Sequence, residues 1–169
     1  MRVGPVRRRG SSLIEAVVAL TLVAVFVAVF LDRALYYREL AEKSAMEQVA
    51  LDLRGSVNLR VAELVLQNRF EDLPALAAAN PMELLAEKPR NYLGVLPPSG
   101  VQDVVTGSWY FDKTAKEVVY FIDLGNNFVS TGASAPKVAW HVVLVSGSEG
   151  PQAPPQWARF ELVRPYRWF

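Results

Sequence analysis

Glu15 is the residue whose position most needs a chemical explanation. It lies at the start of a long apolar stretch, and the next charged residue along the chain is Asp32. An unpaired charge at the centre of a bilayer costs at least about 2.5–3.5 kcal/mol. If this stretch lies in a membrane, a cationic partner must offset that cost. Either such a partner exists, or this stretch is not a membrane span.

The other residues that could do chemistry form no catalytic set. The chain has no cysteine and one histidine, His141, which excludes a thiol nucleophile, a zinc–thiolate site and a disulfide framework. His141 has no second histidine and no acid at ligand spacing, so we expect a surface or edge residue of a strand and not a catalytic base. Ser11 and Ser12 lie near arginines, but no base accompanies them. The sequence therefore predicts no catalytic residue, no cofactor, no metal site built on these residues and no enzyme.

One segment has oxygen-bearing side chains of the kind that bind calcium. It reads Asp123-Leu124-Gly125-Asn126-Asn127. It lacks the spaced acids and the terminal glutamate of an EF-hand loop. A calcium site and a simple turn both stay open at this point, and we favour the turn.

Composition and charge narrow the class of protein. The 169 residues are enough for one domain plus an appendage. A hydrophobic content of 51% against 21% charged residues excludes a disordered chain, and a net charge of +1 gives no sign of nucleic-acid binding. Arg2 and Arg7–Arg9 fall in the first ten residues, which contain no acid. The chain thus has a basic tip on a mildly acidic body.

Residues 11–31 are apolar enough and long enough to span a bilayer. As a helix this run would measure about 31 Å, which matches the hydrocarbon core. The basic residues before it predict a cytoplasmic segment 1–10 and a non-cytoplasmic chain after Leu31. A buried helix of a soluble protein fits poorly, because the 16 residues from Ala16 to Leu31 carry no charge. A secretory signal peptide also fits poorly, because the run ends VFLDRALYY, without a small-x-small cleavage pair.

The order of these features resembles the cleavage and assembly signature of the type IV pilin and pseudopilin superfamily. A basic leader ends in Gly10, a small polar pair follows, and Leu13-Ile14-Glu15 opens the apolar helix. In that family a membrane aspartyl peptidase cuts after the glycine and usually methylates the new N-terminus. The resemblance implies cleavage between Gly10 and Ser11, N-methylation of Ser11, and an assembly role for Glu15 opposite the amine of a neighbouring subunit. The family usually has phenylalanine or another large apolar residue where this chain has Ser11.

The resemblance also implies a function and a set of partners. It points to a prepilin-like structural subunit, a minor pilin or a pseudopilin, of a type IV pilus or a type II secretion pseudopilus. Its partners would be a prepilin peptidase, other pilin or pseudopilin subunits, an inner-membrane assembly platform and the lipid bilayer, with no nucleic acid. The stretch GSWYFDKTAKEVVYFID further resembles accessory subunits of mannose-sensitive haemagglutinin-type pili.

A second interpretation needs no filament. The chain could be a non-polymerising bitopic inner-membrane protein whose periplasmic domain binds a partner. Both interpretations place the chain in a bacterial inner membrane with a single pass, a cytoplasmic N-terminus and a periplasmic head. The first adds an extracellular or periplasmic filament after assembly.

The helical pattern continues beyond the apolar run, through residues 32–67. No proline interrupts this stretch, and apolar residues recur at steps of three and four, which predicts an amphipathic helix. The predicted stripe consists of Met46, Val49, Leu53, Val57, Val61 and Leu64. The charged face consists of Glu42, Lys43, Glu47, Asp52, Arg54 and Arg60, which we expect to be solvated.

Residues 68–106 are predicted to connect this helix to a sheet in 107–169. Short helical turns are expected at Leu73–Ala79 and Met82–Glu87, and a helix exit or tight turn at Asn91–Gly94. After Gly107 the hydrophobic period changes to two, which predicts four strands, in SWYFD, EVVYFIDL, KVAWHVVLV and WARFELV. The aromatic ending RPYRWF is expected to pack on the sheet.

The predicted fold class is therefore α+β. One long N-terminal helix, half membrane-spanning and half amphipathic, would pack on a four-stranded antiparallel sheet made of two hairpins. This layout follows from the periodicities, and the pilin resemblance implies the same roll.

Overall fold

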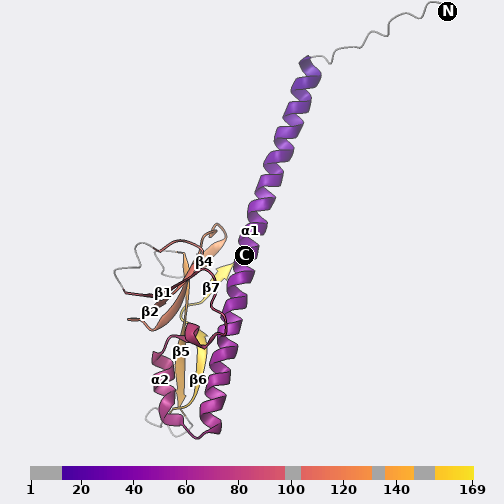
Figure 1. Cartoon of the computed structure of the whole chain (residues 1–169). Coiled ribbons are helices and arrows are strands. Elements are labelled where there is room, and N and C mark those ends of the chain that lie inside the picture. The colour runs from indigo at the N-terminus through magenta and orange to yellow at the C-terminus, as the bar shows by residue number, and fades with distance from the viewer. Residues whose placement is uncertain (1–12, 98–103, 131–135, 147–154) are drawn as a thin grey trace, which may run out of the picture. The chain divides into compact units, whose positions relative to one another are not determined.

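The computed structural model describes residues 13–97, 104–130, 136–146 and 155–169. The chain divides into two compact units, Met1–Arg38 and Glu39–Phe169. Helix α1, Leu13–Leu66, is continuous from the first unit into the second (Figure 1). The prediction of a single long helix is confirmed over the described residues.

In the second unit, which we call the head, α1 buries the apolar stripe that its sequence predicts. Met46, Leu53, Val57, Val61 and Leu64 are all at most 2% exposed, and Val49 packs against the same core. These positions lie three, four or seven residues apart, so they share one face of the helix. The helix is thus amphipathic where it meets the sheet.

A five-stranded sheet forms the other layer of the head. Its order is β1 (Tyr92–Leu96), β2 (Ser108–Asp112), β3 (Glu117–Phe121), β5 (Lys137–Ser146) and β6 (Pro155–Leu162). Strands β2, β3, β5 and β6 pair antiparallel, and they are the four strands that the alternating pattern predicts. Strand β1 pairs parallel with β2.

The predicted strand count of four is wrong, because three short strands carry little periodic signal. Strand β1 covers part of Asn91–Gly94, where a turn or helix exit was expected, and it contains Gly94 at a φ of 93°. The register of β1 shifts at this glycine, as expected for a bulge. Strands β4 (Phe128–Ser130) and β7 (Tyr166–Trp168) form a separate two-stranded sheet of three residues each. Three residues are too few for a period of two to show.

Short helical elements connect α1 to the sheet. They are η1 (Phe70–Asp72), α2 (Leu73–Ala78) and η2 (Pro81–Leu84). The helical turn predicted from Leu73 is confirmed, whereas the one predicted at Met82–Glu87 ends at Leu84. Helix α2 packs against β5 and β6, beside which it lies in Figure 1.

The core of the head lies between these helices and one face of the five-stranded sheet. The α1 stripe meets Trp109, Trp140 and Phe160, all at most 5% exposed. The ring centroids of Trp109 and Trp140 are 5.4 Å apart, and those of Trp140 and Phe160 are 6.4 Å apart. Phe160 therefore faces the helix side, as the alternation of WARFELV predicts.

Candidate functional site

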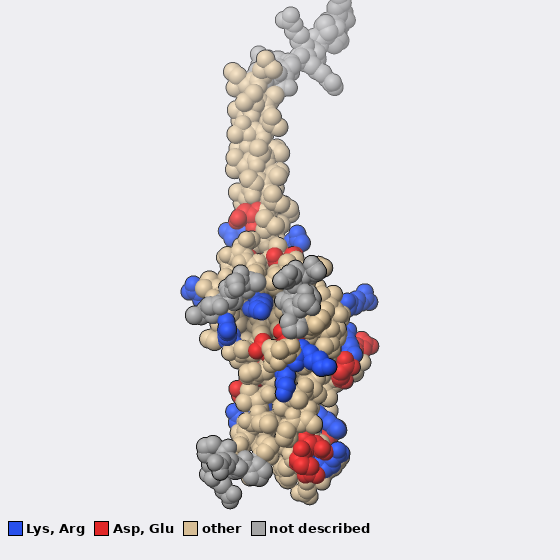
Figure 2. Space-filling model, turned by 90° about the vertical axis from the view of Figure 1, so that its left-hand side faces the viewer, with Lys and Arg blue, Asp and Glu red and all other residues tan. Residues whose placement is uncertain are grey.

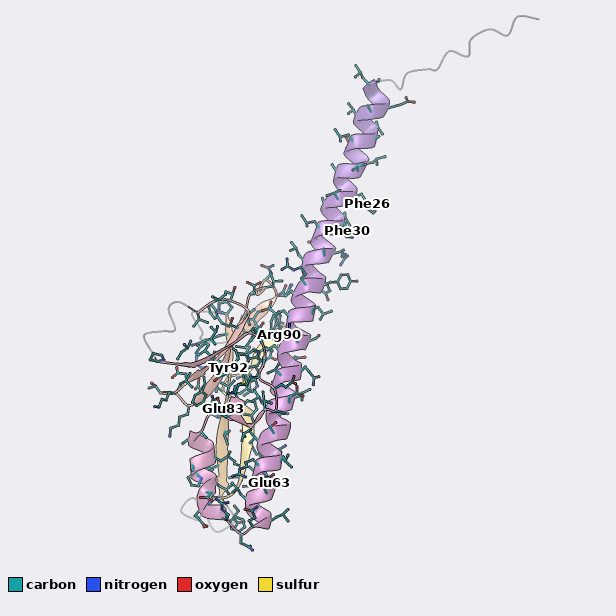
Figure 3. All side chains as sticks on the ribbon, viewed as in Figure 1. Phe26, Phe30, Glu63, Glu83, Arg90 and Tyr92 are labelled. Carbon is teal, nitrogen blue, oxygen red and sulfur yellow. The ribbon has the colours of Figure 1, made fainter. Side chains whose placement is uncertain are left out.

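The apolar half of α1 exposes its side chains on every side. An 18-residue window of α1 has a mean hydropathy of 2.8, and none of it is buried within the structure. Phe26 and Phe30 are 73% and 66% exposed and project from the helix (Figure 3). On the face seen in Figure 2, this half shows only uncharged side chains until acidic and basic ones begin near the head. By length and composition the helix can cross a membrane.

Glu15 lies in the first described turn of α1, and its side chain is exposed. The N-terminus of a helix carries partial positive charge, so a carboxylate is favoured there. The scissile pair predicted by the motif, Gly10 and Ser11, lies outside the described residues. Cleavage, methylation and the assembly role of Glu15 stay predictions.

Glu39, the first residue of the head, has a buried carboxylate that the sequence pattern did not predict. Glu39 is 2% exposed. One of its oxygens accepts hydrogen bonds from the Asn127 backbone N–H at 2.8 Å and from the Trp168 indole N–H at 2.9 Å. The other accepts from the Asn127 amide at 2.8 Å. Three neutral donors thus offset the desolvation of the charge.

Glu42 binds the neighbouring loop in the same manner. Its carboxylate accepts hydrogen bonds from the backbone N–H groups of Asp123 at 2.7 Å and Leu124 at 2.8 Å, and from the Tyr120 hydroxyl at 3.0 Å. Lys43 donates to the Trp168 carbonyl at 3.0 Å. The expectation that Glu42 and Lys43 belong to a solvated face is therefore wrong.

These contacts define a polar clamp, made of Glu39, Glu42 and Lys43. Its members are spaced three and four residues apart on α1, so they share a face. That face continues the buried stripe, because Glu39 lies seven residues before Met46. The seven-residue spacing from Glu39 to Met46 was the available signal in the sequence. A search for apolar residues at that spacing passes over Glu39, because it is charged.

The segment 123–127 is the loop that the clamp holds. The Phe128 N–H donates to the Gly125 carbonyl at 3.2 Å, which closes a turn, and an Asp123 side-chain oxygen accepts from the Thr106 hydroxyl. Among the described residues, no group of three or more His, Cys, Asp or Glu side chains comes together that could hold a metal ion. The loop contacts α1 and Thr106, and the Asn127 carbonyl accepts a hydrogen bond from the Phe169 N–H at 3.4 Å. These contacts are those of a docking turn.

Tyrosine hydroxyls extend the polar contacts of α1. Burial, with the nearby Glu42 carboxylate, raises the pKa of Tyr120 above its usual range. Burial raises the pKa of Tyr166 to about 12, and its hydrogen bond to Glu47 adds to the effect. Both hydroxyls therefore stay protonated at neutral pH and act as donors.

His141 lies on the face of the sheet opposite Trp140, and it has acidic neighbours that its sequence spacing does not show. Glu117 on β3 and Glu161 on β6 are its direct cross-strand partners. Spacing along the sequence does not show these acids, because they lie on two other strands. Within the described part of the chain, these three side chains do not come together as a group that could hold a metal ion.

No family model matches the chain, and neither a curated protein nor a solved structure does. A functional interpretation therefore depends on the residues and contacts described above.

Proposed function

We propose that the chain is a prepilin-like structural subunit, a minor pilin or a pseudopilin, which is cleaved after Gly10 and assembles through its N-terminal helix. The observation that carries the proposal is the position of Glu15. It is the only carboxylate before Asp32, and it lies five residues after the glycine that ends a basic leader. The leader's arginines favour a cytoplasmic N-terminus.

The architecture supports this proposal in two respects. Helix α1 continues without a break from an exposed apolar half into a head of α+β class. The exposed half leaves many large apolar side chains without cover, and exposed apolar surface of this extent marks contact with lipid or with other proteins. A bundle of parallel apolar helices would cover them in a filament, and lipid would cover them before assembly.

Cleavage would supply the charge that Glu15 needs. A cut between Gly10 and Ser11 creates a cationic amine at Ser11. When a subunit joins a bundle of parallel helices, that amine can meet the Glu15 carboxylate of its neighbour. The pair offsets the cost of holding a carboxylate in an apolar environment. The chain then works as a structural subunit and not as an enzyme, with a prepilin peptidase, other subunits and an inner-membrane platform as partners.

The mass of the mature N-terminus tests the proposal. Co-expression of the full chain with a prepilin peptidase should remove residues 1–10, and intact-mass spectrometry would also show whether Ser11 is methylated. Gly10→Val should abolish processing, because a β-branched side chain hinders the extended backbone that a protease binds. Gly55→Val in α1 is the matched control and should be processed normally. An intact leader on the parent chain would favour a bitopic protein that never polymerises.

A further inference from the structure

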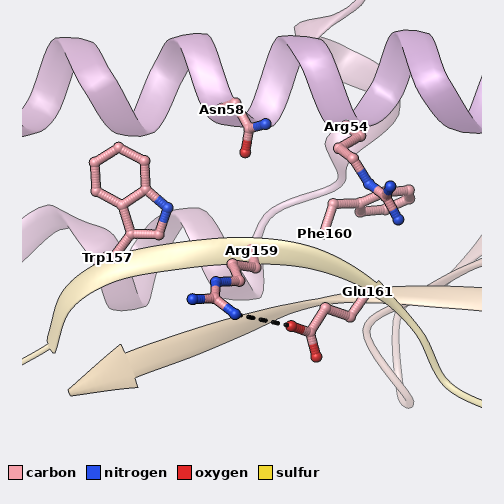
Figure 4. Close-up of a pocket in the computed structure, with 6 residues that line it drawn as sticks. All are labelled: Arg54, Asn58, Trp157, Arg159, Phe160 and Glu161. Carbon is pink, nitrogen blue, oxygen red and sulfur yellow. Dashed lines mark ion pairs between the residues drawn. The ribbon is translucent and has the colours of Figure 1, made fainter.

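A surface groove lies between α1 and β6. Its larger part has a volume of about 500 Å³ and is lined by Arg54, Asn58, Trp157, Arg159, Phe160 and Glu161 (Figure 4). A second hollow of about 330 Å³ also includes Arg54 and reaches Glu47 and Tyr166. From Glu47 to Asn58, α1 rises about 16 Å. That length matches about five residues of extended chain.

The groove contains hydrogen-bond donors with no partner among the described residues. The Arg54 guanidinium, the Asn58 amide and the Trp157 indole N–H make no hydrogen bond or ion pair within the described part of the chain. Arg54 and Asn58 are exposed, and Trp157 is 37% exposed. Arg159 approaches Glu161 only at 3.9 Å, which makes a weak pair in water. The groove therefore offers cationic and neutral donors, beside the one carboxylate of Glu161 in its larger part, to a ligand that carries acceptors.

Strand β6 adds a row of main-chain groups along the same groove. It is the last strand in the order of the five-stranded sheet, so among the described strands it has a neighbour on one side only. An open edge presents main-chain N–H and C=O groups that another extended chain can pair with. Charged side chains on an edge discourage indiscriminate pairing. Arg159 and Glu161 therefore restrict this edge to a partner of suitable charge.

We propose that this groove binds an extended acidic peptide segment of a partner protein. The segment pairs with the β6 main chain and places one carboxylate against the Arg54 guanidinium. A guanidinium can bind a carboxylate through two parallel hydrogen bonds, which fixes the register of the segment. The Trp157 ring, 37% exposed, offers apolar surface to its flanking side chains. This site does not depend on filament assembly, so it would operate in either kind of membrane protein.

A peptide selection tests the chemistry without a known partner. A displayed library of random seven-residue peptides is selected against the full chain in lipid nanodiscs, with Arg54→Gln as the parallel target. We expect the parent chain to enrich peptides with one Asp or Glu between β-branched or aromatic residues. Arg54→Gln should lose that enrichment. Arg90→Gln removes the same charge from an exposed position outside the groove and should keep it.

The selected peptide then permits a quantitative test. Fluorescence anisotropy should show binding about tenfold to a hundredfold weaker for Arg54→Gln, as expected for the loss of a charged hydrogen bond. Replacing the Asp or Glu of the peptide by Asn or Gln should weaken its binding to the parent chain by a similar factor. Hydrogen exchange of the backbone amides in 155–162 should slow when the peptide is bound, because strand addition protects an edge.

Three results would overturn the proposal. The first is enrichment that does not depend on an acidic residue or on Arg54. The second is peptide binding without protection of β6. The third is a dimer of the full chain in light scattering whose β6 amides are protected from hydrogen exchange without peptide. A second copy of the chain would then occupy the edge. Circular dichroism of Arg54→Gln separates loss of binding from loss of fold.

Discussion

The two halves of α1 belong to one helix but meet different surroundings. From Ala16 to Leu31 the side chains are exposed and, apart from Thr21, apolar on all sides, with Phe26 at 73%. After residue 39 the buried apolar residues form one stripe, in which Leu53 and Val57 are 0% exposed. The second half is buried by the sheet of its own chain. The first half has no such cover in its own unit.

This difference shows how the chain separates folding from association. Burial of the stripe in the second half stabilises the head, because each buried aliphatic side chain contributes about 1.5–3 kcal/mol. The apolar surface of the first half contributes nothing to that fold. It is available to lipid or to other helices. Changes in the first half should therefore alter assembly, and changes in the second half should alter stability.

The largest expected effect is the loss of assembly in Glu15→Leu. If the carboxylate pairs with the amine of a neighbouring subunit, its removal should reduce incorporation into filaments by about tenfold or more, since a desolvated charge pair contributes several kcal/mol when one partner is lost. Membrane insertion should persist, because removing a charge favours lipid. Membrane fractionation and recovery of sheared filaments would measure the two steps separately.

Thr21→Val is the control for Glu15→Leu on the same helix. The Thr21 hydroxyl donates to the Val17 carbonyl at 2.8 Å, so the helix itself satisfies this polar group. The valine variant should insert and assemble like the parent. Normal incorporation of Glu15→Leu would show that Glu15 is no assembly residue and would favour the bitopic interpretation.

In the second half, Phe160→Ala should produce the largest loss of stability. A chain truncated to residues 33–169 lacks the apolar segment and should be soluble, with mixed helix and strand by circular dichroism. Phe160 is 2% exposed between α1 and the sheet, so its truncation should cost about 3–5 kcal/mol. Urea unfolding would measure this. Leu144→Ala, at a position 36% exposed, should cost far less, and equal losses would contradict the deeper burial of Phe160.

Periodic apolar burial is the part of this fold that the sequence predicts well. The stripe on α1 and strands β2, β3, β5 and β6 each repeat an apolar residue at the spacing of their own geometry. In each of these elements the apolar spacing repeats often enough to identify the helix or strand. The orientation of Phe160 follows directly from this alternation.

The sequence does not predict the features that depend on contacts between distant segments. Strand β1 is short, contains Gly94 and gains its place by pairing with β2. The clamp residue Glu39 is polar at a buried position, and its donors Asn127 and Trp168 lie far along the chain. The groove beside Arg54 exists only because β6 ends the sheet next to α1. Apart from the heptad spacing between Glu39 and Met46, none of these has a local pattern.

Glu39→Gln tests the clamp and should have a smaller effect than Phe160→Ala. The amide has one acceptor oxygen in place of two and presents an N–H₂ group towards the donors of Asn127 and Trp168. We expect a loss of about 2–3 kcal/mol in the free energy of unfolding, the range for hydrogen bonds to a charged group. Glu71→Gln changes an exposed carboxylate and should be neutral within about 0.5 kcal/mol. A neutral Glu39→Gln would show that the clamp does not stabilise the head.

The smallest expected effect is that of Tyr166→Phe, which removes one hydroxyl from the contact with Glu47. At neutral pH the loss should be about 0.5–1.5 kcal/mol, the value of one hydrogen bond. The ring of Tyr166 lies 5.6 Å from that of Phe128, and the phenylalanine keeps this contact. Tyr37→Phe, at an exposed position, should leave the free energy of unfolding unchanged.

The same variant should alter how stability depends on pH. The pKa of Tyr166 is about 12 in the folded chain, against about 10 in an unfolded one. The unfolded chain therefore loses this proton first, so the stabilisation is complete below about pH 10 and falls as the pH rises towards about 12. Tyr110 and Tyr120 also have raised pKa values, so some alkaline loss should persist in Tyr166→Phe. Urea unfolding of the truncated chain over this range should give a shallower fall for the variant, and an identical fall would place the Tyr166 hydroxyl in water rather than against α1.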